Sequence, residues 1–403
     1  MMKGETAMSE LYLGIDIEKD RLHAALTENA ETVVTVTEPL DGSSFGRFCE
    51  RAVSMISELA QEYRPKSIGL TGDPKGIVYI DSNGNAVSEL MLSPKKEDDY
   101  ISRIEKECGI TLRRGSGLLT HYINTDIGTV PESAQSFSTL ASYIVKTLAD
   151  RNRPYLHTSE AFELGFYDFS AKDFDSRSIV KCRLADLRYP EVTDAPSVAG
   201  YLGNTPIAVA LGRTQSHFLG TADIGGALVL LRKDANISYS VAKNEKQASA
   251  TVKMPLFGGI ELCERTDRDA KTAYDALLSL FARISVSVGG TEDIERTVNE
   301  LALAALNETS LPKVRFDQGK LKISSESDGF TPDRICSAFV KEAAKRLCTV
   351  SKTPTRLMLA GNGRFDSEAF RRSLAHVFGV DATPCDMTFA AAAGAARFAS
   401  ELG

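Results

Sequence analysis

The stretch LYLGIDIEKDRLHAALTENAETVVTV, residues 11–36, holds three apolar runs separated by polar turns. The first two runs, 11–17 and 22–26, flank the charged tetrad 18–21, and the third covers 33–36. Short apolar runs bounded by turn residues are typical of strands. The stretch therefore predicts a strand, turn, strand, strand meander.

A helix and a fourth strand are predicted directly after this meander. From Ser43 to Tyr63 the apolar residues fall on one helical face, and Ser43 or Ser44 can cap the start of the helix. Residues 67–70 then predict a buried strand. Three strands, a helix and a further strand resemble the opening of the ribonuclease H-like lobe of actin, hexokinase and many sugar kinases.

The length of the chain, 403 residues, suits two lobes of about 200 residues each, which predicts a cleft between them. With 43% hydrophobic and 25% charged residues, the composition excludes a disordered or fibrous protein. The net charge of −7 offers no basic surface for nucleic acid or anionic lipid. We therefore expect neither nucleic acid nor a membrane as a partner.

The start of the chain, MMKGETAMSE, lacks the apolar core of a signal peptide, and no later stretch reaches the roughly 18 apolar residues that span a bilayer. Residues 1–10 are expected to be a disordered extension, with Met8 as an alternative start to Met1. The seven cysteines are scattered without a C-x-x-C pair, so thiols of a reducing compartment are expected. These features predict a cytoplasmic protein.

The middle of the chain, residues 100–167, is mostly helical in its period. Pro131 has the position of a first-turn proline for a helix over 134–148. Residues 194–205 are rich in Gly, Pro, Ser and Asn, which predicts the lobe boundary. The expected lobes are N-terminal, 11–198, and C-terminal, 199–403.

The C-terminal lobe is expected to begin with apolar strands at 207–211 and 227–231. Thr331, Pro332 and Asp333 supply a cap, a proline and an acid, so they predict the start of a helix that reaches Leu347. A strand near Arg356–Ala360, a helix from about Ser367 and a helix near the C-terminus follow.

Longer runs of sequence are more specific than these elements. They are TGDPKGIVYID (71–81), NGNAVS (83–88), GSGLLTHY (115–122), RPYLHTSEA (153–161), GFYD (165–168), ALGRTQSHFLG (210–220), AGNG (360–363) and the alanine-rich 390–396. In this order they resemble the FGGY carbohydrate kinases, closest to the sedoheptulokinase branch, over most of residues 11–399.

The resemblance implies an α/β fold of two ribonuclease H-like (actin/hexokinase-like) lobes with a cleft between them. The similar openings of the lobes, Gly14-Ile15-Asp16-Ile17 and Asp223-Ile224-Gly225-Gly226, agree with two like-built lobes. The family transfers the γ-phosphate of ATP, with Mg²⁺, to a sugar hydroxyl. The partner that the resemblance implies is therefore a small-molecule sugar or nucleotide. A homodimer is also compatible with it.

The base of such a kinase is a carboxylate beside the sugar hydroxyl. The family has an aspartate after Ala-Leu-Gly, but this chain has Arg213 there. A guanidinium stays protonated and cannot accept the proton, and loss of a general base typically lowers the rate about 10²–10⁴-fold. Asp16, which the resemblance implies to be the magnesium-facing carboxylate, is retained. Arg213 as an ordinary solvated residue is the alternative.

The first phosphate loop also departs from the family. Glycine and small hydroxyl residues normally follow Gly-Ile-Asp-Ile, whereas this chain has Glu18, Lys19 and Asp20. Without the glycine, the turn brings backbone amides less easily to a phosphate. An ordinary charged hairpin turn is the better description.

The second phosphate loop allows two registers. One keeps the strand 226–231 and puts Arg232-Lys233-Asp234 where the glycines belong. The other, which we favour, matches residues 223–226 to the loop, because this leaves more nearly the expected distance to Phe257-Gly258-Gly259. The candidate nucleotide-binding residues are Gly14, Lys19, Asp223, Gly225, Gly226, Gly258, Gly259, Gly361, Asn362 and Gly363.

The sugar side differs as well. Between the glycines of its hairpin the family has glutamine and histidine, but this chain has Asp73, Pro74 and Lys75. Glu160 keeps the acidic character of the family's aspartate in its helix. The candidate sugar-binding residues are Gly72, Asp73, Lys75, Gly76 and Glu160.

Three coincident departures predict a sugar-kinase homologue in which phosphorylation is absent or very slow and the role is binding or regulation. The alternative is a working carbohydrate kinase that recruits another base, such as Asp16, Asp73 or Asp223. A scaffold with a protein partner is a third class, for which the sequence gives no specific sign.

Overall fold

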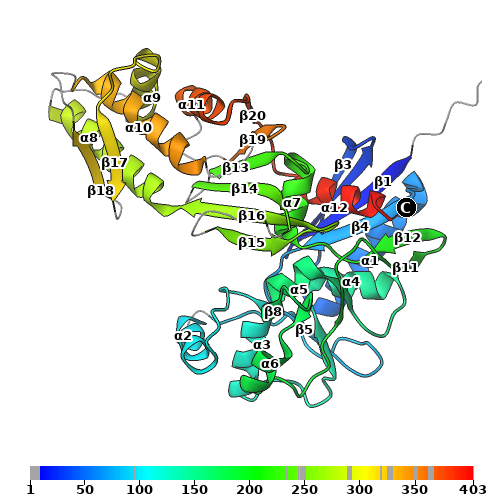
Figure 1. The fold of residues 1–403 in the computed structure, drawn as a ribbon. Helices are drawn as coiled ribbons and strands as arrows, with labels where there is room; N and C mark the ends of the chain where they lie inside the picture. Colours follow the sequence, from blue (N-terminus) through cyan, green and yellow to red (C-terminus); the bar gives the residue numbers. More distant parts are fainter. Residues whose placement is uncertain are drawn as a thin grey trace, which may run out of the picture. The chain divides into compact units, whose positions relative to one another are not determined.

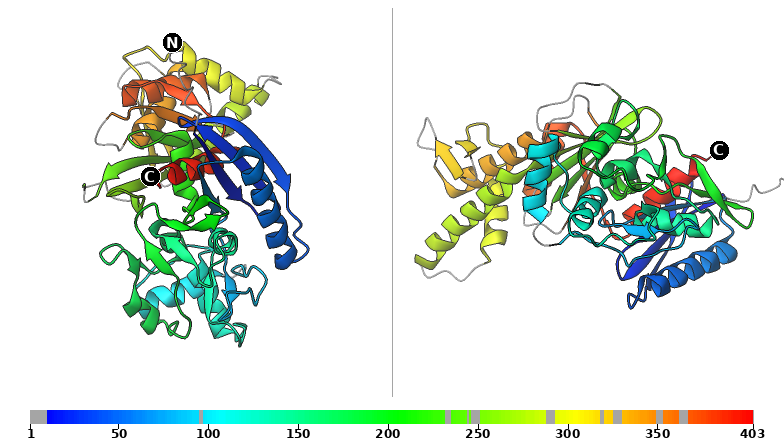
Figure 2. Two further views of the ribbon diagram at one scale, coloured as in Figure 1. Left: turned by 90° about the vertical axis from the view of Figure 1, so that its right-hand side faces the viewer. Right: turned by 90° about the horizontal axis from the view of Figure 1, so that it is seen from below.

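The computed structural model describes residues 10–94, 97–231, 235–243, 245, 251–287, 293–317, 320–324, 330–348, 353–361 and 367–402. The chain divides into two compact units (Figures 1 and 2). Unit 1 comprises Met1–Gly220, Met254–Ile260 and Thr388–Gly403, and unit 2 comprises Thr221–Lys253 and Glu261–Met387. None of the helices in the described ranges has the length and apolar character needed to cross a bilayer.

The meander predicted from residues 11–36 forms the edge of the six-stranded sheet of unit 1. β1 (Leu11–Ile17), β2 (Arg21–Glu28) and β3 (Glu31–Pro39) pair antiparallel in sequence order. The chain then forms α1 (Phe45–Tyr63), capped by the Ser44 side chain, and β4 (Ser67–Gly72), which pairs parallel to β1. The predicted order of elements is confirmed.

The sheet of unit 1 has the order β11-β12-β4-β1-β2-β3. β11 (Val198–Leu202) and β12 (Thr205–Ala208) form its other edge. Unit 1 therefore continues past the boundary expected at 198, because these two strands need β4 as their neighbour.

The C-terminal helix α12 (Ala390–Ser400) lies against β1 and β4, with α1 on the opposite side of the strands (Figure 2). A Cβ atom on Gly14 would lie 1.8 Å from the carbonyl oxygen of Ala392, and one on Gly69 would lie 2.0 Å from that of Ala395. Two glycines on neighbouring strands thus let the helix backbone approach the sheet closely.

The rest of unit 1 consists of short strands and helices around a second hydrophobic cluster. They are β5 (Val78–Ile80), α2 (Glu97–Cys108), α3 (Gly117–Asp126), β6 (Ser136–Ser138), α4 (Leu140–Leu148), β7 (Tyr155–His157), α5 (Thr158–Leu164), β8 (Tyr167–Asp168), β9 (Asp173–Phe174), α6 (Ser176–Lys181), β10 (Glu191–Thr193) and α7 (Arg213–Thr221).

Two expectations for this region are wrong. The helix predicted over 134–148 begins only at Leu140, with Thr139 as its cap, because Ser136–Ser138 pairs with β5 as a strand. Cys108 and Cys182 form a disulfide, although only thiols were expected. The two cysteines are 74 residues apart in sequence and end α2 and α6.

Unit 2 contains a second six-stranded sheet of the order β15-β16-β14-β13-β19-β20. Its strands are β13 (Ala227–Leu231), β14 (Ala235–Ala242), β15 (Val252–Pro255), β16 (Ile260–Asp267), β19 (Leu357–Ala360) and β20 (Ala382–Pro384). The helices α8 (Arg268–Ser287), α9 (Ile294–Ala304), α10 (Pro332–Leu347) and α11 (Glu368–Phe378) and the hairpin of β17 (Lys313–Asp317) and β18 (Lys320–Ser324) complete it. Thr331 is the N-cap of α10, as predicted, and α11 begins directly after its N-cap Ser367, near the predicted start.

The register favoured for the second phosphate loop is not the one that the sheet adopts. β13 is intact and pairs antiparallel with β14, from Ala227 opposite Tyr239 to Leu231 opposite Ala235. Residues 223–226 form a turn that precedes β13. The alternative register also keeps this strand; residues 232–234, which it puts where the glycines belong, lie outside the described residues.

Candidate functional site

The ends of β1 and β4 bring several predicted site residues of unit 1 together. In the parallel pair Asp16 lies opposite Thr71, and the amide of Asp73 donates to the carbonyl oxygen of Ile17 at 3.0 Å. The amide of Leu211, two residues before Arg213, donates to the Leu70 carbonyl at 3.0 Å. Asp16, Asp73 and Arg213 therefore lie near the C-terminal ends of the central strands β1 and β4.

At these strand ends the guanidinium of Arg213 forms ion pairs with two carboxylates. Its Nη2 atom is 2.9 Å from Oδ2 of Asp16 and also contacts Oε1 of Glu18. The Asp16 side chain is only 3% exposed and that of Arg213 is 22% exposed. We call these three residues the Arg213 cluster. Arg213 is thus a partly buried, paired cation and not a solvated surface residue.

The charges of the Arg213 cluster depend on burial and on each other. Burial raises the pKa of Asp16, and the neighbouring Arg213 only partly opposes this. Burial disfavours the charge of Arg213, but Asp16 and Glu18 together raise its pKa. The guanidinium therefore stays a cation and cannot take a proton from a hydroxyl.

Mg²⁺ prefers oxygen ligands and keeps several waters, so one or two carboxylates are enough to hold it. One oxygen of Asp16 is paired with Arg213, and the other, Oδ1, is buried without a hydrogen-bond partner. Across the described ranges no group of three His, Cys, Asp or Glu side chains is arranged to hold a metal ion. With one oxygen engaged by Arg213, Asp16 fits the metal that the resemblance implies only if that ion pair opens.

Glu160 lies on α5, enclosed by hydroxyl groups. The hydroxyls of Thr139 and Ser142 both donate to its carboxylate, and the residue is 3% exposed. Burial raises the pKa of Glu160 to about 8, so its carboxyl group is largely protonated at neutral pH. Glu160 therefore packs in the interior and does not line any of the pockets described below.

Stability should depend on pH through Glu160. The pKa of its carboxyl group is higher in the folded state than its ordinary value, so its stabilising contribution is complete below about pH 4.5 and is lost as the pH rises toward about 8. We therefore compare the unfolding free energy of Glu160→Gln with that of wild type. This difference should shift in favour of the variant by roughly 2 kcal/mol when the pH is raised from 5 to 7. Urea titrations at both pH values measure this. A difference that does not change with pH would contradict the assignment.

Sequence reasoning missed two acidic residues of unit 1. In the sequence Glu18 was only a departure from the family's first phosphate loop, whereas it is the second partner of Arg213. Glu163, one turn after Glu160, is 8% exposed and accepts the amide of Thr214 at 3.4 Å, at the start of α7. Burial raises its pKa to about 7. Its spacing of three from Glu160 was the only signal available in the sequence.

The remaining sugar-side candidates form the turn after β4. The Asp73 carboxylate accepts the amide of Lys75 at 3.1 Å, and Gly76, at a φ of +82°, donates its amide to Gly115 at 3.3 Å. The stem of Lys75 packs beside Gly115, and the residue is exposed. Gly72 ends β4.

The nucleotide-side candidates within unit 1 are dispersed. Gly14 is covered by α12. Lys19 lies at a pocket of 220 Å³ between the turn after β1 and the start of α1, with Ser44 and Glu89. Gly258 and Gly259 form the open turn between β15 and β16.

The unit 2 candidates have structural partners. Asp223 accepts the amide of Ile224 at 2.7 Å, and the Gly225 amide donates to the Ser240 hydroxyl at 2.8 Å. A Cβ atom on Gly226 would lie 2.1 Å from the Ala222 carbonyl oxygen, and one on Gly361 would lie 2.0 Å from that of Leu231. These two glycines permit close backbone packing. Asn362 and Gly363 lie outside the described residues.

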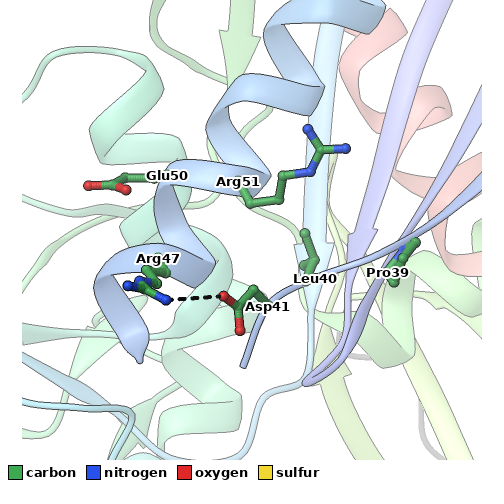
Figure 3. Close-up of a pocket in the computed structure, with 6 residues that line it drawn as sticks. All are labelled: Pro39, Leu40, Asp41, Arg47, Glu50 and Arg51. Carbon is green, nitrogen blue, oxygen red and sulfur yellow. Dashed lines mark ion pairs between the residues drawn. The ribbon is translucent and has the colours of Figure 1, made fainter. Parts of the chain in front are cut away.

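A pocket of about 720 Å³ lies where β3 ends and α1 begins (Figure 3). It is lined by Pro39, Leu40, Asp41, Arg47, Glu50 and Arg51. Figure 3 shows Arg47 directed at Asp41, with an N–O distance of 4.0 Å. None of the candidate site residues lines this pocket.

No model of a protein family matches the sequence, and no curated protein matches it. Solved structures do match the fold. The xylulose kinase from Rhodospirillum rubrum has a TM-score of 0.74 at 16% identity, over 98% of this chain and 91% of that one. The xylulose kinase from Bifidobacterium adolescentis has a TM-score of 0.72 at 14% identity, over 98% of this chain and 93% of that one.

The Plasmodium falciparum glycerol kinase with ADP gives a TM-score of 0.69 at 12% identity, over 97% of this chain and 89% of that one. All three matches extend over nearly the whole chain, so it has the two-lobed α/β fold of these carbohydrate kinases, as the sequence predicted. At this identity the likeness establishes the fold and leaves the activity to be argued from the residues.

Proposed function

We propose that this protein is a sugar-kinase homologue of the sedoheptulokinase-like branch in which ATP-dependent phosphorylation is absent or very slow. Its role is to bind a small-molecule sugar or nucleotide, or to regulate, in the cytoplasm. The observation that supports this most is the ion pair of Arg213 with Asp16. A permanent cation holds the base position and also neutralises the carboxylate that would face the metal.

The chemistry of phosphoryl transfer makes this arrangement unfavourable. Such catalysis depends on positioning and on cations near the transferred group, together with a carboxylate that accepts the hydroxyl proton. In the Arg213 cluster the carboxylates are occupied by the protein's own cation. Neither proton acceptance nor metal binding by Asp16 is available without breaking that pair.

A coupled-enzyme assay tests the proposal over a panel of ketoses and polyols with ATP and Mg²⁺. We expect sugar-dependent ADP formation at the background rate. Robust turnover with any member would overturn the proposal and favour a working kinase. Asp73 would then be the first candidate for the base, because it lies next to the end of β1 that carries Asp16. The variant Asp73→Asn would test that role.

Nucleotide affinity gives an independent measure. Even a ligand present at its dissociation constant stabilises the folded state by about 0.4 kcal/mol, which shifts the melting temperature. If ATP with Mg²⁺ at millimolar concentration leaves the melting temperature unchanged, ATP is not the ligand and the working-kinase alternative fails.

A further inference from the structure

The disulfide between Cys108 and Cys182 joins two helices of unit 1 that are distant in sequence. Cys108 is the last residue of α2, and Cys182 is the C-cap of α6, 74 residues further along the chain. Their Cα atoms are 6.6 Å apart, a separation that a disulfide spans without movement of the backbone. Neither cysteine was a candidate from the sequence, and neither belongs to the Arg213 cluster.

The helix α2 has few other contacts that hold it to unit 1. The structure describes α2 in full, and of its 12 residues only Ile104 is buried. Its other contacts include the edge contact of Tyr100 with Tyr122 and the ion pair of Arg103 with Asp126, in which both side chains are more than one-third exposed. Exposed ion pairs contribute little stability, and a helix of this length is marginal by itself in water. The disulfide therefore supplies a large part of what holds α2 in place.

Gly115 connects α2 with the turn 73–76 after β4, which we call the sugar-side turn. The carboxylate of Glu97, the first residue of α2, accepts the amide of Gly115 at 2.8 Å. The carbonyl oxygen of Gly115 accepts the amide of Gly76 at 3.3 Å, and the stem of Lys75 packs beside Gly115. A change in the order of α2 therefore reaches the sugar-side turn through Gly115.

The five other cysteines are free thiols. Burial raises the pKa to about 12 for Cys49 and Cys336 and to about 11 for Cys263 and Cys385. Because a thiol attacks a disulfide as its thiolate, these four groups should react slowly with small disulfides.

The two sulfurs of the disulfide differ in their access to solvent. Cys108 is half-buried, whereas Cys182 is only 6% exposed. An external thiolate therefore meets the sulfur of Cys108 first.

We infer that Cys108 and Cys182 are a reversible redox pair whose oxidation fixes α2 to α6 and thereby orders the sugar-side turn. The inference rests on the cytoplasmic location in the proposed function, because disulfides in that compartment are usually transient and redox-sensing. It adds a regulation of the sugar side that the proposed function does not contain.

Reduction of the pair consumes two molecules of a small thiol such as glutathione. The first thiolate attacks the sulfur of Cys108, which breaks the bond to Cys182 and leaves a mixed disulfide on Cys108. The second thiolate attacks the glutathione sulfur of that mixed disulfide and releases glutathione disulfide. The protons of the two small thiols pass through solvent to the two protein sulfurs. Oxidation by glutathione disulfide follows the same steps in reverse.

Differential alkylation with mass spectrometry, on the full chain in glutathione buffers, measures the state of the pair. Thiols are blocked with N-ethylmaleimide, and the remaining disulfides are then reduced and labelled with its deuterated form. We expect a dithiol in mostly reduced glutathione, as in the cytosol, and a disulfide in mostly oxidised glutathione. Cys385, a half-buried free thiol, should be labelled alike in both buffers.

Hydrogen–deuterium exchange of the same two samples measures what the bond holds in place. Reduction should speed exchange in α2 at least about tenfold, and in the sugar-side turn to a smaller extent, because a lost disulfide makes local opening easier. Exchange in β1 should change much less.

Variants assign the effect to the pair. Cys108→Ser should exchange in α2 at the fast rate in either buffer, and Cys385→Ser, the matched control, should respond to the buffers as wild type does. Circular dichroism establishes that each variant is folded. The comparison of the two wild-type samples needs no substitution, so it decides the question even if a variant does not fold.

A pair that stays a disulfide in mostly reduced glutathione would be a permanent structural bridge, and one that stays a dithiol in mostly oxidised glutathione would be no bridge. Either result overturns the inference, as does equal exchange of α2 in the two states. A failure of the proposed function is separate, because sugar-dependent ADP formation would reveal it. An active kinase with a redox-dependent α2 would refute the proposed function and leave the role of the pair standing.

Discussion

Replacing Arg213 by alanine is expected to lower the free energy of unfolding by about 3–5 kcal/mol at neutral pH, because it leaves a buried carboxylate without its cation. Asp16 is the residue most affected, since its side chain is only 3% exposed. Urea denaturation of Arg213→Ala and wild type measures the loss. Arg372→Ala, which removes an exposed ion pair with Glu368, is the control and should change stability little.

The loss should shrink when the carboxylate can be neutralised. Burial raises the pKa of Asp16, so lowering the pH protonates it more readily than an exposed aspartate. Arg213→Ala should therefore approach wild type in stability as the pH falls. A loss that stays constant, or that is as small as for Arg372→Ala, would show that Arg213 does not hold Asp16.

The second large effect is expected at Gly14, which was a candidate nucleotide-binding residue. A Cβ atom there would lie 1.8 Å from the carbonyl oxygen of Ala392 and 2.5 Å from the amide nitrogen of Ala396. Both are backbone atoms of α12, so the helix has to move off the sheet. We expect Gly14→Ala to cost about 3 kcal/mol or more, which thermal and urea unfolding both report.

Gly46→Ala is the matched control, because nothing lies within 4 Å of the Cβ position and the residue is within α1. Alanine favours a helix over glycine by about 1 kcal/mol, so this variant should be as stable as wild type or more so. If Gly14→Ala also kept wild-type stability, the close packing of α12 on β1 would be refuted, and a direct role for Gly14 in ligand binding would regain support.

Much of the fold could be predicted because local signals and tertiary packing agree. The apolar runs at 11–17 and 227–231 became β1 and β13, and Thr331-Pro332 began α10. Predictions failed where pairing with a segment distant in sequence determines the secondary structure. Residues 136–138 belong to a strand only because β5 lies beside them, and the sequence signal of Pro131 cannot reveal that partner.

The candidate site was predictable in its residue types but not in its contacts. Resemblance placed Arg213 at the base position, yet its pairing with Asp16, 197 positions away, depends on how β1 meets the start of α7. Gly14, Gly226 and Gly361 suggested nucleotide contacts, whereas their backbones pack closely against neighbouring carbonyl groups. A glycine pattern alone does not distinguish these two uses.

The coupling energy between Arg213 and Asp16 measures whether the cation at the base position holds this buried carboxylate. Urea unfolding of wild type, Arg213→Ala, Asp16→Asn and the double variant at neutral pH gives this energy as a double-mutant cycle. We expect a coupling of about 2 kcal/mol or more, with Asp16→Asn relieving much of the loss caused by Arg213→Ala. A coupling within about 0.5 kcal/mol of zero would mean that the two side chains are independent, leaving Asp16 free for a metal ion.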